Sequence, residues 1–302
     1  MNKEFEFLEI INENLEDNSF LGDDCAFLKE ENLCVSTDTL VEDVHFSRKF
    51  MNTKEIARKA FLVNISDAIA SGGKIKYATI ALSGSFNKDF IEEFYKETNL
   101  ISKEFDFKII GGDLTKSEKI FINITVFAST KNRNISSRKN AKEGYLVGTK
   151  GFFGSSAKGL LELQKGIKES EFINIHKAPV LYPKIADYMA KTNSPYAMMD
   201  SSDGLADCLY QISKKSKVKI SVEYDKIPRK IEGKTQGKAQ EKDLVLFGGE
   251  DYNLVICAKK EDILENKDIV VIGKVEKGEG VFIDDIELSK EEIEKKEYKH
   301  FE

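Results

Sequence analysis

Cysteine and histidine are scarce in this chain of 302 residues, and their scarcity excludes several kinds of site. The four cysteines are scattered and include no Cys-x-x-Cys pair, so we expect neither a disulfide framework nor a zinc site. Each is expected to be a small core residue. The three histidines are too few for a histidine-rich metal site. The residues concerned are Cys25, Cys34, Cys208, Cys257, His45, His176 and His300.

Long apolar runs are also missing. No segment approaches the roughly 18 uninterrupted apolar residues of a membrane span, and the acidic start of the chain lacks the apolar block of a signal peptide. We therefore expect a cytoplasmic protein without a membrane segment. The net charge of −6 implies no large basic surface, which argues against a nucleic-acid partner.

Several well-known catalytic motifs are absent as well. The chain contains no Gly-x-x-x-x-Gly-Lys-Ser/Thr loop, which excludes a P-loop protein. It also lacks the His-Arg-Asp set of protein kinases, the His-Glu-x-x-His helix of zinc proteases and the Gly-x-Ser-x-Gly elbow of hydrolases.

The composition that remains is that of a globular protein with substantial cores, since 41% of the residues are hydrophobic and 32% are charged. The length favours two domains of about 150 residues each. Mixed strand and helix patterns in both halves predict an α/β (α+β) fold. The polar stretch 129–134 is the best linker candidate, which gives domains at 1–135 and 136–302.

Carboxylates recur at the ends of short apolar runs. Such a run predicts a buried strand, and a carboxylate at its end would be partly buried. Several buried anions need a compensating cation, and clusters of oxygen ligands suit Mg²⁺. The sequence therefore predicts a metal-dependent site. The runs are 20–22, 33–35, 109–110, 197–199 and 244–247, and the acids that follow them are Asp23, Asp24, Asp38, Asp113, Asp200, Asp203, Glu250 and Asp251.

A helix is predicted from Thr53, as its N-cap, to the glycines at 72–73. Ile56, Ala60 and Val63 form its apolar stripe, and Asp67 falls on the same stripe. An acid in that position is either paired or bound to a metal.

Other elements follow from similar patterns. We expect a helix capped by Asn87, a helix over 179–191 and a polar loop over 230–243. Each acid also has a simpler interpretation, because an Asp at a strand end often only caps a turn or the next helix. Recurrence of the arrangement along the whole chain weakens that alternative.

The order of these motifs is itself informative. The chain contains, in sequence, Gly22-Asp23-Asp24-Cys25-Ala26, Ser36-Thr37-Asp38-Thr39-Leu40-Val41 with Val44-His45-Phe46, Val63-Asn64-Ile65-Ser66-Asp67, Gly111-Gly112-Asp113, Met199-Asp200-Ser201-Ser202-Asp203-Gly204-Leu205, Gly248-Gly249-Glu250-Asp251-Tyr252 and Tyr298-Lys299-His300-Phe301. Together they resemble the thiamine-monophosphate kinase family of the aminoimidazole ribonucleotide synthetase-like superfamily. The resemblance covers nearly the whole chain.

The resemblance implies a reaction in which ATP and thiamine monophosphate give ADP and thiamine diphosphate. It also implies a homodimer in which the N-terminal sheets associate, and several Mg²⁺ ions. The implied metal ligands are Asp24, Ser36, Thr37, Asp38, Asp67, Asp113, Asp200 and Asp203. The implied ATP contacts are Tyr95, Gly112, Asp113, Arg138 and Ser202, and the implied substrate contacts are His45, Glu250 and Tyr298.

Phosphoryl transfer between two phosphorylated partners fits this set, because it requires alignment and neutralised charge more than covalent help. Arg138 could clamp a phosphate, although an Arg in a polar linker is usually only solvated. Tyr298 could stack on a thiamine ring or, alternatively, only pin down the C-terminal tail. His45 has a similar alternative as a structural hydrogen-bond partner.

The chain departs from the family pattern in several places. Ser155 stands where the family usually has Asp, Asp43 stands where Gly is usual, and the segment 177–182 replaces an Arg- and Pro-rich motif. The region 230–243 is also short. None of these changes affects an implied metal ligand.

Two other interpretations remain. The first is another synthetase of the superfamily, although selenophosphate synthetase would require a reactive Cys or selenocysteine in a Gly-rich N-terminal segment, which is missing here. The second is a non-catalytic module whose carboxylates hold structural ions. Only turnover separates a kinase from such a module.

Overall fold

The computed structural model describes residues 3–231 and 233–296 and contains two mixed β-sheets. The first has the strand order β1-β2-β5-β3-β4. Its strands are β1 (Ala26–Leu28), β2 (Leu33–Val41), β3 (Lys74–Ser83), β4 (Lys108–Thr115) and β5 (Phe121–Ser129). Only β3 and β4 pair in parallel; the other neighbours are antiparallel.

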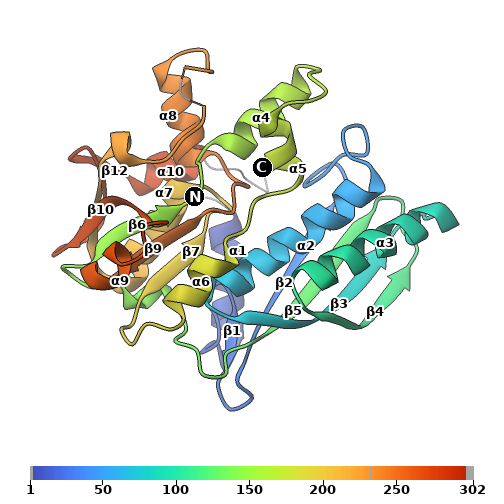
Figure 1. Cartoon of the computed structure of the whole chain (residues 1–302), viewed down its shortest axis with the longest axis horizontal. Coiled ribbons are helices and arrows are strands. Elements are labelled where there is room, and N and C mark those ends of the chain that lie inside the picture. The colour runs from blue at the N-terminus through green and yellow to red at the C-terminus, as the bar shows by residue number, and fades with distance from the viewer. Residues whose placement is uncertain (1–2, 232, 297–302) are drawn as a thin grey trace.

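Helices cover one face of this sheet. They are α2 (Thr53–Ala70) and α3 (Lys88–Glu104), and both lie in front of the sheet in Figure 1. Ile122, Ile124 and Val126 of β5 point toward them and are fully buried, whereas the residues between them are less buried. This alternation indicates that, within the described chain, the opposite face carries no helical layer. We call it the outer face.

The second sheet has the order β12-β11-β8-β10-β6-β9-β7. Its strands are β6 (Leu146–Lys150), β7 (Ala197–Asp200), β8 (Lys219–Val222), β9 (Leu254–Ala258), β10 (Val270–Glu276), β11 (Gly280–Ile283) and β12 (Ile286–Leu288). The remaining helices are α1 (Lys3–Asn14), α4 (Ser155–Gln164), α5 (Glu171–Lys177), α6 (Pro183–Met189), α7 (Leu205–Ser216), α8 (Lys238–Phe247), α9 (Lys260–Leu264) and α10 (Lys290–Lys296), with short 3-10 turns at Arg138–Asn140 and Tyr224–Lys226.

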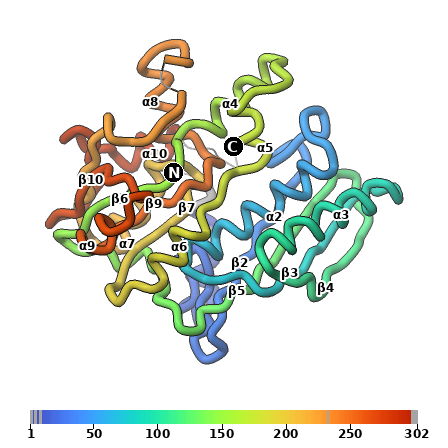
Figure 2. The backbone as a smooth tube through the Cα atoms, viewed as in Figure 1, coloured from blue at the N-terminus to red at the C-terminus, as the bar shows by residue number. Residues whose placement is uncertain are grey.

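Helix α2 lies between the two sheets. It contacts β2, β3 and β5 on one side and β7 on the other, and the cartoon and the backbone tube both show it running between the two halves of the molecule (Figures 1 and 2). Its residues are buried around the whole circumference, Lys59 and Asn64 included. The sequence predicts a single apolar stripe on this helix. The buried surface is wider than that stripe because a second layer covers the other side of the helix.

Several boundaries differ from the sequence-based expectation. The N-cap of α2 is Asn52 rather than Thr53, and it forms a capping box with Glu55. The run 244–247, expected to be a strand, is the end of α8, which also begins inside the expected loop 230–243. The helix expected over 179–191 is present but shorter, as α6, and α5 precedes it at residues 171–177. The Asn87 cap is confirmed, since its side chain accepts from Phe90 N.

The first sheet occupies 26–129 and the second occupies 146–288. Their cores are not fully separate, because Met198, Leu254 and Ile256 of the second sheet pack in the same apolar cluster as α2. The division at residue 135 therefore stays a prediction.

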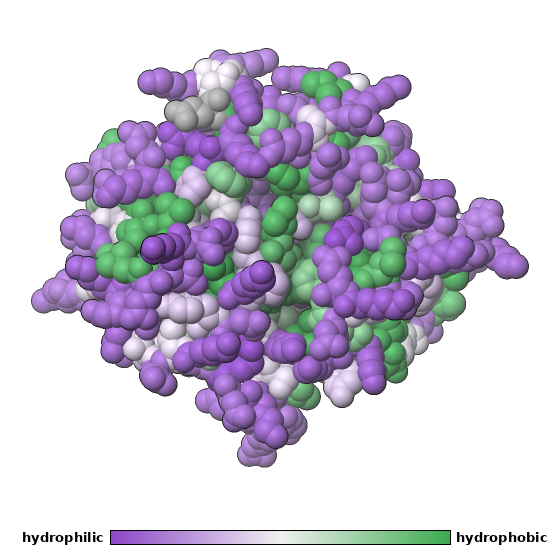
Figure 3. Space-filling model, viewed as in Figure 1, coloured by the Kyte–Doolittle hydropathy of each residue, from purple (hydrophilic) through white to green (hydrophobic). Residues whose placement is uncertain are grey.

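No helix in the described part of the chain is long and apolar enough to cross a membrane. On the face shown in Figure 3, hydrophilic side chains dominate the periphery and apolar residues show mainly toward the centre.

Candidate functional site

A cavity of about 330 Å³ lies between the two halves of the molecule. Helix α2 and strand β2 supply one wall, and the loops beside β7 and β9 with the start of α4 supply the other. The lining residues are Asp38, Thr39, Leu40, Val44, His45, Lys59, Val63, Asp67, Ser156, Ala157, Leu160, His176, Ser202, Asp203, Gly249, Glu250 and Tyr252.

Strand pairing brings two distant acidic loops to this cavity. Strands β7 and β9 are antiparallel neighbours with Asp200 opposite Leu254, so the loop after β7 and the loop before β9 meet at one end of the sheet. Backbone bonds then join them, from Glu250 N to Ser202 O at 2.6 Å and from Tyr252 N to Ser201 O at 3.2 Å. The register therefore places Asp203 and Glu250 in the same wall.

The backbone at the site is strained. Glu250 and Tyr252 have φ values of 63° and 52°, which side chains other than Gly rarely adopt. Gly249 allows the close approach, because a Cβ there would lie 2.7 Å from Ser202 O. Asp43, which precedes the lining residues Val44 and His45 of the opposite wall, has a φ of 64°. Gly would adopt this conformation without strain, and Asp tolerates it better than most residues.

Five carboxylates from distant parts of the chain lie near one another. Asp38, Asp67 and Asp203 line the cavity, while Asp24 and Asp200 are buried beside them. We call these five residues the acidic cluster. Burial, followed by the neighbouring carboxylates, raises the pKa of Asp38 to about 6 and that of Asp67 well above its ordinary value. Burial also raises the pKa of Asp200 to about 7.

Few groups compensate this charge. Arg138 donates to Asp24 at 2.6 Å, and Ser66 donates to Asp200 at 2.5 Å. Ser36 donates to Asp67. Burial raises the pKa of Asp24 even though Arg138 opposes the shift. Ser202 Oγ also donates to Asp203 at 3.2 Å. Among these hydrogen bonds of the described residues, Arg138 is the one cationic donor beside five carboxylates.

At the other end of the cavity, a lysine and a histidine lie beside the Glu250 carboxylate. The Lys59 ammonium is 2.9 Å from Glu250 Oε1 and donates to His45 O at 3.0 Å. His176 Nδ1 is 3.4 Å from Glu250 Oε2 and 3.0 Å from Ser156 Oγ. Burial and Lys59 lower the pKa of His176 to about 4, so its ring is neutral at pH 7. Burial alone would raise the pKa of Glu250, but Lys59 and His176 lower it below its ordinary value.

Asp251 fixes the start of α4 instead of facing the cavity. Its carboxylate accepts from Gly154 N at 2.6 Å and from Ser156 N at 2.8 Å. Burial nevertheless raises its pKa to about 7. Ser155, where the family usually has Asp, donates to Phe152 O at 3.0 Å. The loop 151–154 is therefore attached to the Glu250 wall through Asp251.

The chain brings together most of the residues expected from the sequence but not all of them. The Thr37 hydroxyl bonds to Ile124 O on the outer face, whereas Asp38 faces the cavity. Asp113 is opposite Ala81 in β4 and also faces outward, on an exposed edge strand. Gly112 lies beside it, and Tyr95 is on α3 outside the cavity lining. Tyr298 lies outside the described residues.

Three residues of the site were missed in the sequence. Lys59, His176 and Ser156 line the cavity although no motif pointed to them. The signal for Lys59 was present: it is a lysine inside the most apolar helix of the chain, only eight residues before Asp67. A buried lysine needs a partner, as a buried carboxylate does.

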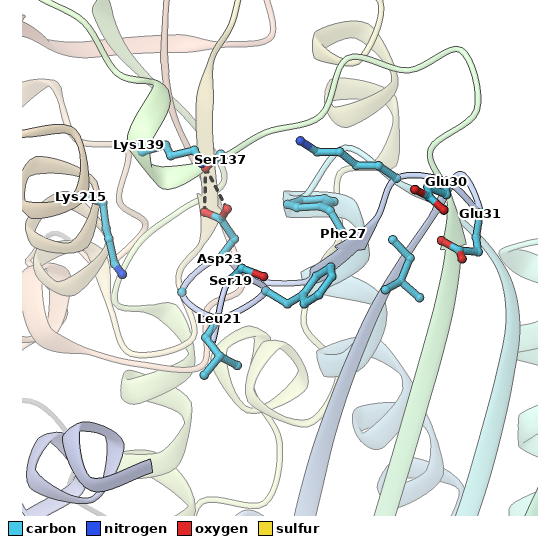
Figure 4. Close-up of a pocket in the computed structure, with 13 residues that line it drawn as sticks. Ser19, Leu21, Asp23, Phe27, Glu30, Glu31, Ser137, Lys139 and Lys215 are labelled. Carbon is cyan, nitrogen blue, oxygen red and sulfur yellow. Dashed lines mark hydrogen bonds between the residues drawn. The ribbon is translucent and has the colours of Figure 1, made fainter. Parts of the chain in front are cut away.

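A second cavity of about 570 Å³ lies on the other side of the Asp23–Asp24 segment. Figure 4 shows Lys139 and Lys215 on one side of Asp23 and Glu30 and Glu31 on the far side. Asp23 accepts from Ser137 Oγ at 2.8 Å and from Arg138 N at 2.8 Å. These bonds orient Arg138 toward the acidic cluster.

Within residues 3–231 and 233–296, no three His, Cys, Asp or Glu side chains are placed so that they alone could hold a metal ion. The donor set of the acidic cluster nevertheless consists only of oxygen atoms. Mg²⁺ usually binds in this way, using one or two carboxylates and completing its shell with water and substrate phosphates.

Comparison with known proteins is consistent with this site. Residues 22–130 match the family model described as AIR synthase related protein, N-terminal domain. The chain is 33% identical to the thiamine-monophosphate kinase of Aquifex aeolicus (strain VF5) over 99% of this chain and 98% of that protein. It is 30% identical to the thiamine-monophosphate kinase of Bacillus subtilis (strain 168) over 93% of each.

A solved structure described as "AaThiL complexed with AMPPCP and TMP" superposes on this chain with a TM-score of 0.88 at 32% identity. The superposition covers 99% of this chain and 97% of that one. With the sequence identities above and the motif residues gathered around one cavity, these likenesses establish that the chain belongs to the thiamine-monophosphate kinase family.

Proposed function

We infer that this protein is an ATP-dependent kinase that phosphorylates thiamine monophosphate to thiamine diphosphate. The observation that carries the inference is the match to thiamine-monophosphate kinases along almost the whole chain, together with one cavity lined by residues of the matching motifs. The related structure with AMPPCP and TMP supports an ATP analogue and the substrate as ligands of this fold.

Mg²⁺ is part of the proposal. The acidic cluster and Ser36 would hold it. Burial raises the pKa values of Asp38 and Asp200, and one guanidinium, that of Arg138 on Asp24, does not balance several buried carboxylates. When bound, Mg²⁺ neutralises phosphate charge and aligns the two phosphates. Arg138 would contact ATP, since its Nε is buried without a hydrogen-bond partner among the described residues.

His45 is proposed to donate to the phosphate of the substrate. Its Nδ1 accepts from Val41 N at 3.0 Å, so the neutral ring carries its proton on Nε2. Glu250 would accept from the polar edge of the thiamine moiety, and Ser202 would contact ATP from the same wall. Tyr298 stays a proposed contact to the thiamine ring.

The decisive experiment is incubation with ATP, Mg²⁺ and thiamine monophosphate, followed by chromatography of the products. Thiamine diphosphate and ADP in equal amounts are expected. A module that only binds ATP would form neither, and another synthetase of the superfamily would leave thiamine monophosphate unchanged.

We also propose that the protein is a homodimer formed through the outer face of the first sheet. Tyr77 and Phe121 are 43% and 38% exposed on this face, and no helix of the described chain covers it. A second copy packed there would cover Asp113, which lies on the outer face of its own chain and not in the acidic cluster. A cytoplasmic location belongs to the proposal too, since all four cysteines are free and buried.

The first prediction concerns charge in the acidic cluster. Asp38→Asn and Asp203→Asn keep the side-chain shape but remove a negative ligand, so turnover should fall at least about a hundredfold. In EDTA the melting temperature should not fall, because removing one of several like charges relieves repulsion. Wild-type turnover in either variant would remove that residue from the proposed metal site; Asp225→Asn, exposed near β8, is the control.

The second prediction concerns pH. The raised pKa values of Asp38, about 6, and Asp200, about 7, mean that the folded state binds more protons than the unfolded state between about pH 4 and 7. Stability of the metal-free protein should therefore fall as pH rises through this range. The melting temperature in EDTA should be several degrees lower at pH 8 than at pH 5.5.

The same pH series on Asp38→Asn provides the comparison, because that variant lacks one of the titrating groups. Its dependence on pH should be weaker than that of the wild type. An identical dependence in both proteins would show that Asp38 does not titrate in this range.

The third prediction concerns the route of transfer. The substrate phosphate is already an anionic nucleophile, and the carboxylates are better explained as metal ligands than as phosphoryl acceptors. We expect direct in-line attack in a ternary complex, so initial-rate plots should intersect. γ-Labelled ATP alone should leave no label on the protein. Parallel plots together with a labelled protein would contradict direct transfer.

The fourth prediction concerns the dimer. Light scattering should give twice the chain mass of 34.1 kDa. Tyr77→Glu and Phe121→Glu place a charge on the outer face and should shift the protein to monomers, because burying an unpaired charge is costly. Leu100→Glu, at a 58% exposed position on α3, should leave the mass unchanged. A wild-type monomer at micromolar concentration would contradict the proposed assembly.

A further inference from the structure

Lys59 is the most deeply buried charged side chain in the wall of the main cavity, with 1% of its side chain exposed. It lies on α2, in the first half of the chain, and the Glu250 carboxylate that it contacts lies in the second half. A buried ammonium is stable only with a charged or hydrogen-bonding partner. Glu250, 2.9 Å away, provides that partner across the cavity wall.

The position of the Lys59 ammonium is fixed independently of Glu250. Its stem belongs to a helix that is buried on all sides, and its Nζ also donates to the His45 carbonyl at 3.0 Å. The ammonium is therefore anchored by the backbone of the loop that carries His45. The Lys59 ammonium can therefore orient the Glu250 carboxylate, because its own position does not depend on Glu250.

Glu250 depends on such an anchor more than most carboxylates. Its side chain is 30% exposed toward the cavity, and its backbone has the strained φ of 63°. Oε1 faces Lys59 and Oε2 faces His176 at 3.4 Å. Both oxygens thus have a neighbour on the protein side, and the exposed part of the side chain lines the cavity.

We propose that Lys59 is a positioning residue that holds the Glu250 carboxylate in the orientation that recognises the polar edge of thiamine monophosphate. This rests on the proposed function, because it assumes that Glu250 contacts that substrate. Lys59 acts through Glu250 and does not itself touch the reacting phosphates. Its loss should therefore weaken one substrate selectively.

Lys59→Met keeps the length of the side chain and removes its charge. We expect KM for thiamine monophosphate to rise at least about tenfold, because removing one member of a buried charged pair leaves the other misplaced. KM for ATP should stay within about twofold. An unchanged KM for thiamine monophosphate, or equal increases for both substrates, would overturn the proposal.

Lys177→Met is the matched control. Lys177 forms a similar ion pair with Glu55 at 3.0 Å, between α5 and the start of α2, but neither residue lines the cavity. Both KM values should stay within about twofold of the wild type. A loss of thiamine monophosphate affinity in this variant would mean that any broken pair between the two halves has the same effect.

The second test places Lys59→Met in a Glu250→Gln background. This double variant leaves no unpaired charge of the pair, so it can be measured even if the single variant folds poorly. If Lys59 acts only through the carboxylate, the double variant should match Glu250→Gln within about twofold in KM for thiamine monophosphate. A further tenfold increase would show that Lys59 contacts the substrate itself and would overturn the positioning role.

Calorimetric dissociation constants for thiamine monophosphate separate failure of this inference from failure of the proposed function. A wild type that binds thiamine monophosphate without turnover contradicts the proposed function, and the Lys59 comparison is then made on binding alone. A wild type that turns over, combined with a Lys59→Met variant that binds normally, contradicts only the role of Lys59.

Discussion

Electrostatic repulsion inside the acidic cluster is the constraint on which the rest of the site depends. Asp24, Asp38, Asp67, Asp200 and Asp203 come from four separate stretches of sequence, since Asp200 and Asp203 share one loop, and Arg138 is the one cation that a described ion pair places among them. Burial, followed by the neighbouring carboxylates, raises the pKa values of Asp38, Asp67 and Asp200. Two sheets and α2 hold the carboxylates in place against that repulsion, and residues of all three pack in one apolar core.

Helix α2 organises the cavity along its axis. Lys59, Val63 and Asp67 follow at intervals of four residues and line the same wall. With a rise of 1.5 Å per residue, the first and last are about 12 Å apart along the helix. The helix face is therefore cationic at Lys59, where Glu250 pairs with it, and anionic at Asp67. A ligand with an organic head and a phosphate tail would meet different charges at its two ends.

The sequence predicted the existence of most elements and the residues of the acidic cluster, because both depend on local patterns. It failed at the run 244–247, since four apolar residues suit the last turn of a helix as well as a strand. It also could not assign Thr37 and Asp113 to the outer face. That depends on strand register, and a shift of one residue reverses the face of every side chain.

Lys59 illustrates a different limit of the sequence. A lysine in an apolar helix is visible, but its partner Glu250 is 191 positions away and no local pattern joins them. His176 and Ser156 likewise reach the cavity only through the packing of α4 and α5. Such residues are defined by tertiary structure alone.

The pairing of β7 with β9 has a mechanical consequence. Both acidic loops of the second sheet are joined by backbone hydrogen bonds, so a displacement of one loop must either carry the other with it or break those bonds. The opposite wall belongs to the first sheet and α2, which share an apolar core with the second sheet, and polar contacts such as Ser66 to Asp200 and Lys59 to Glu250 also join the two walls. A ligand that contacts both walls adds further interactions between them. Binding of such a ligand therefore also stabilises the packing of the two halves against each other.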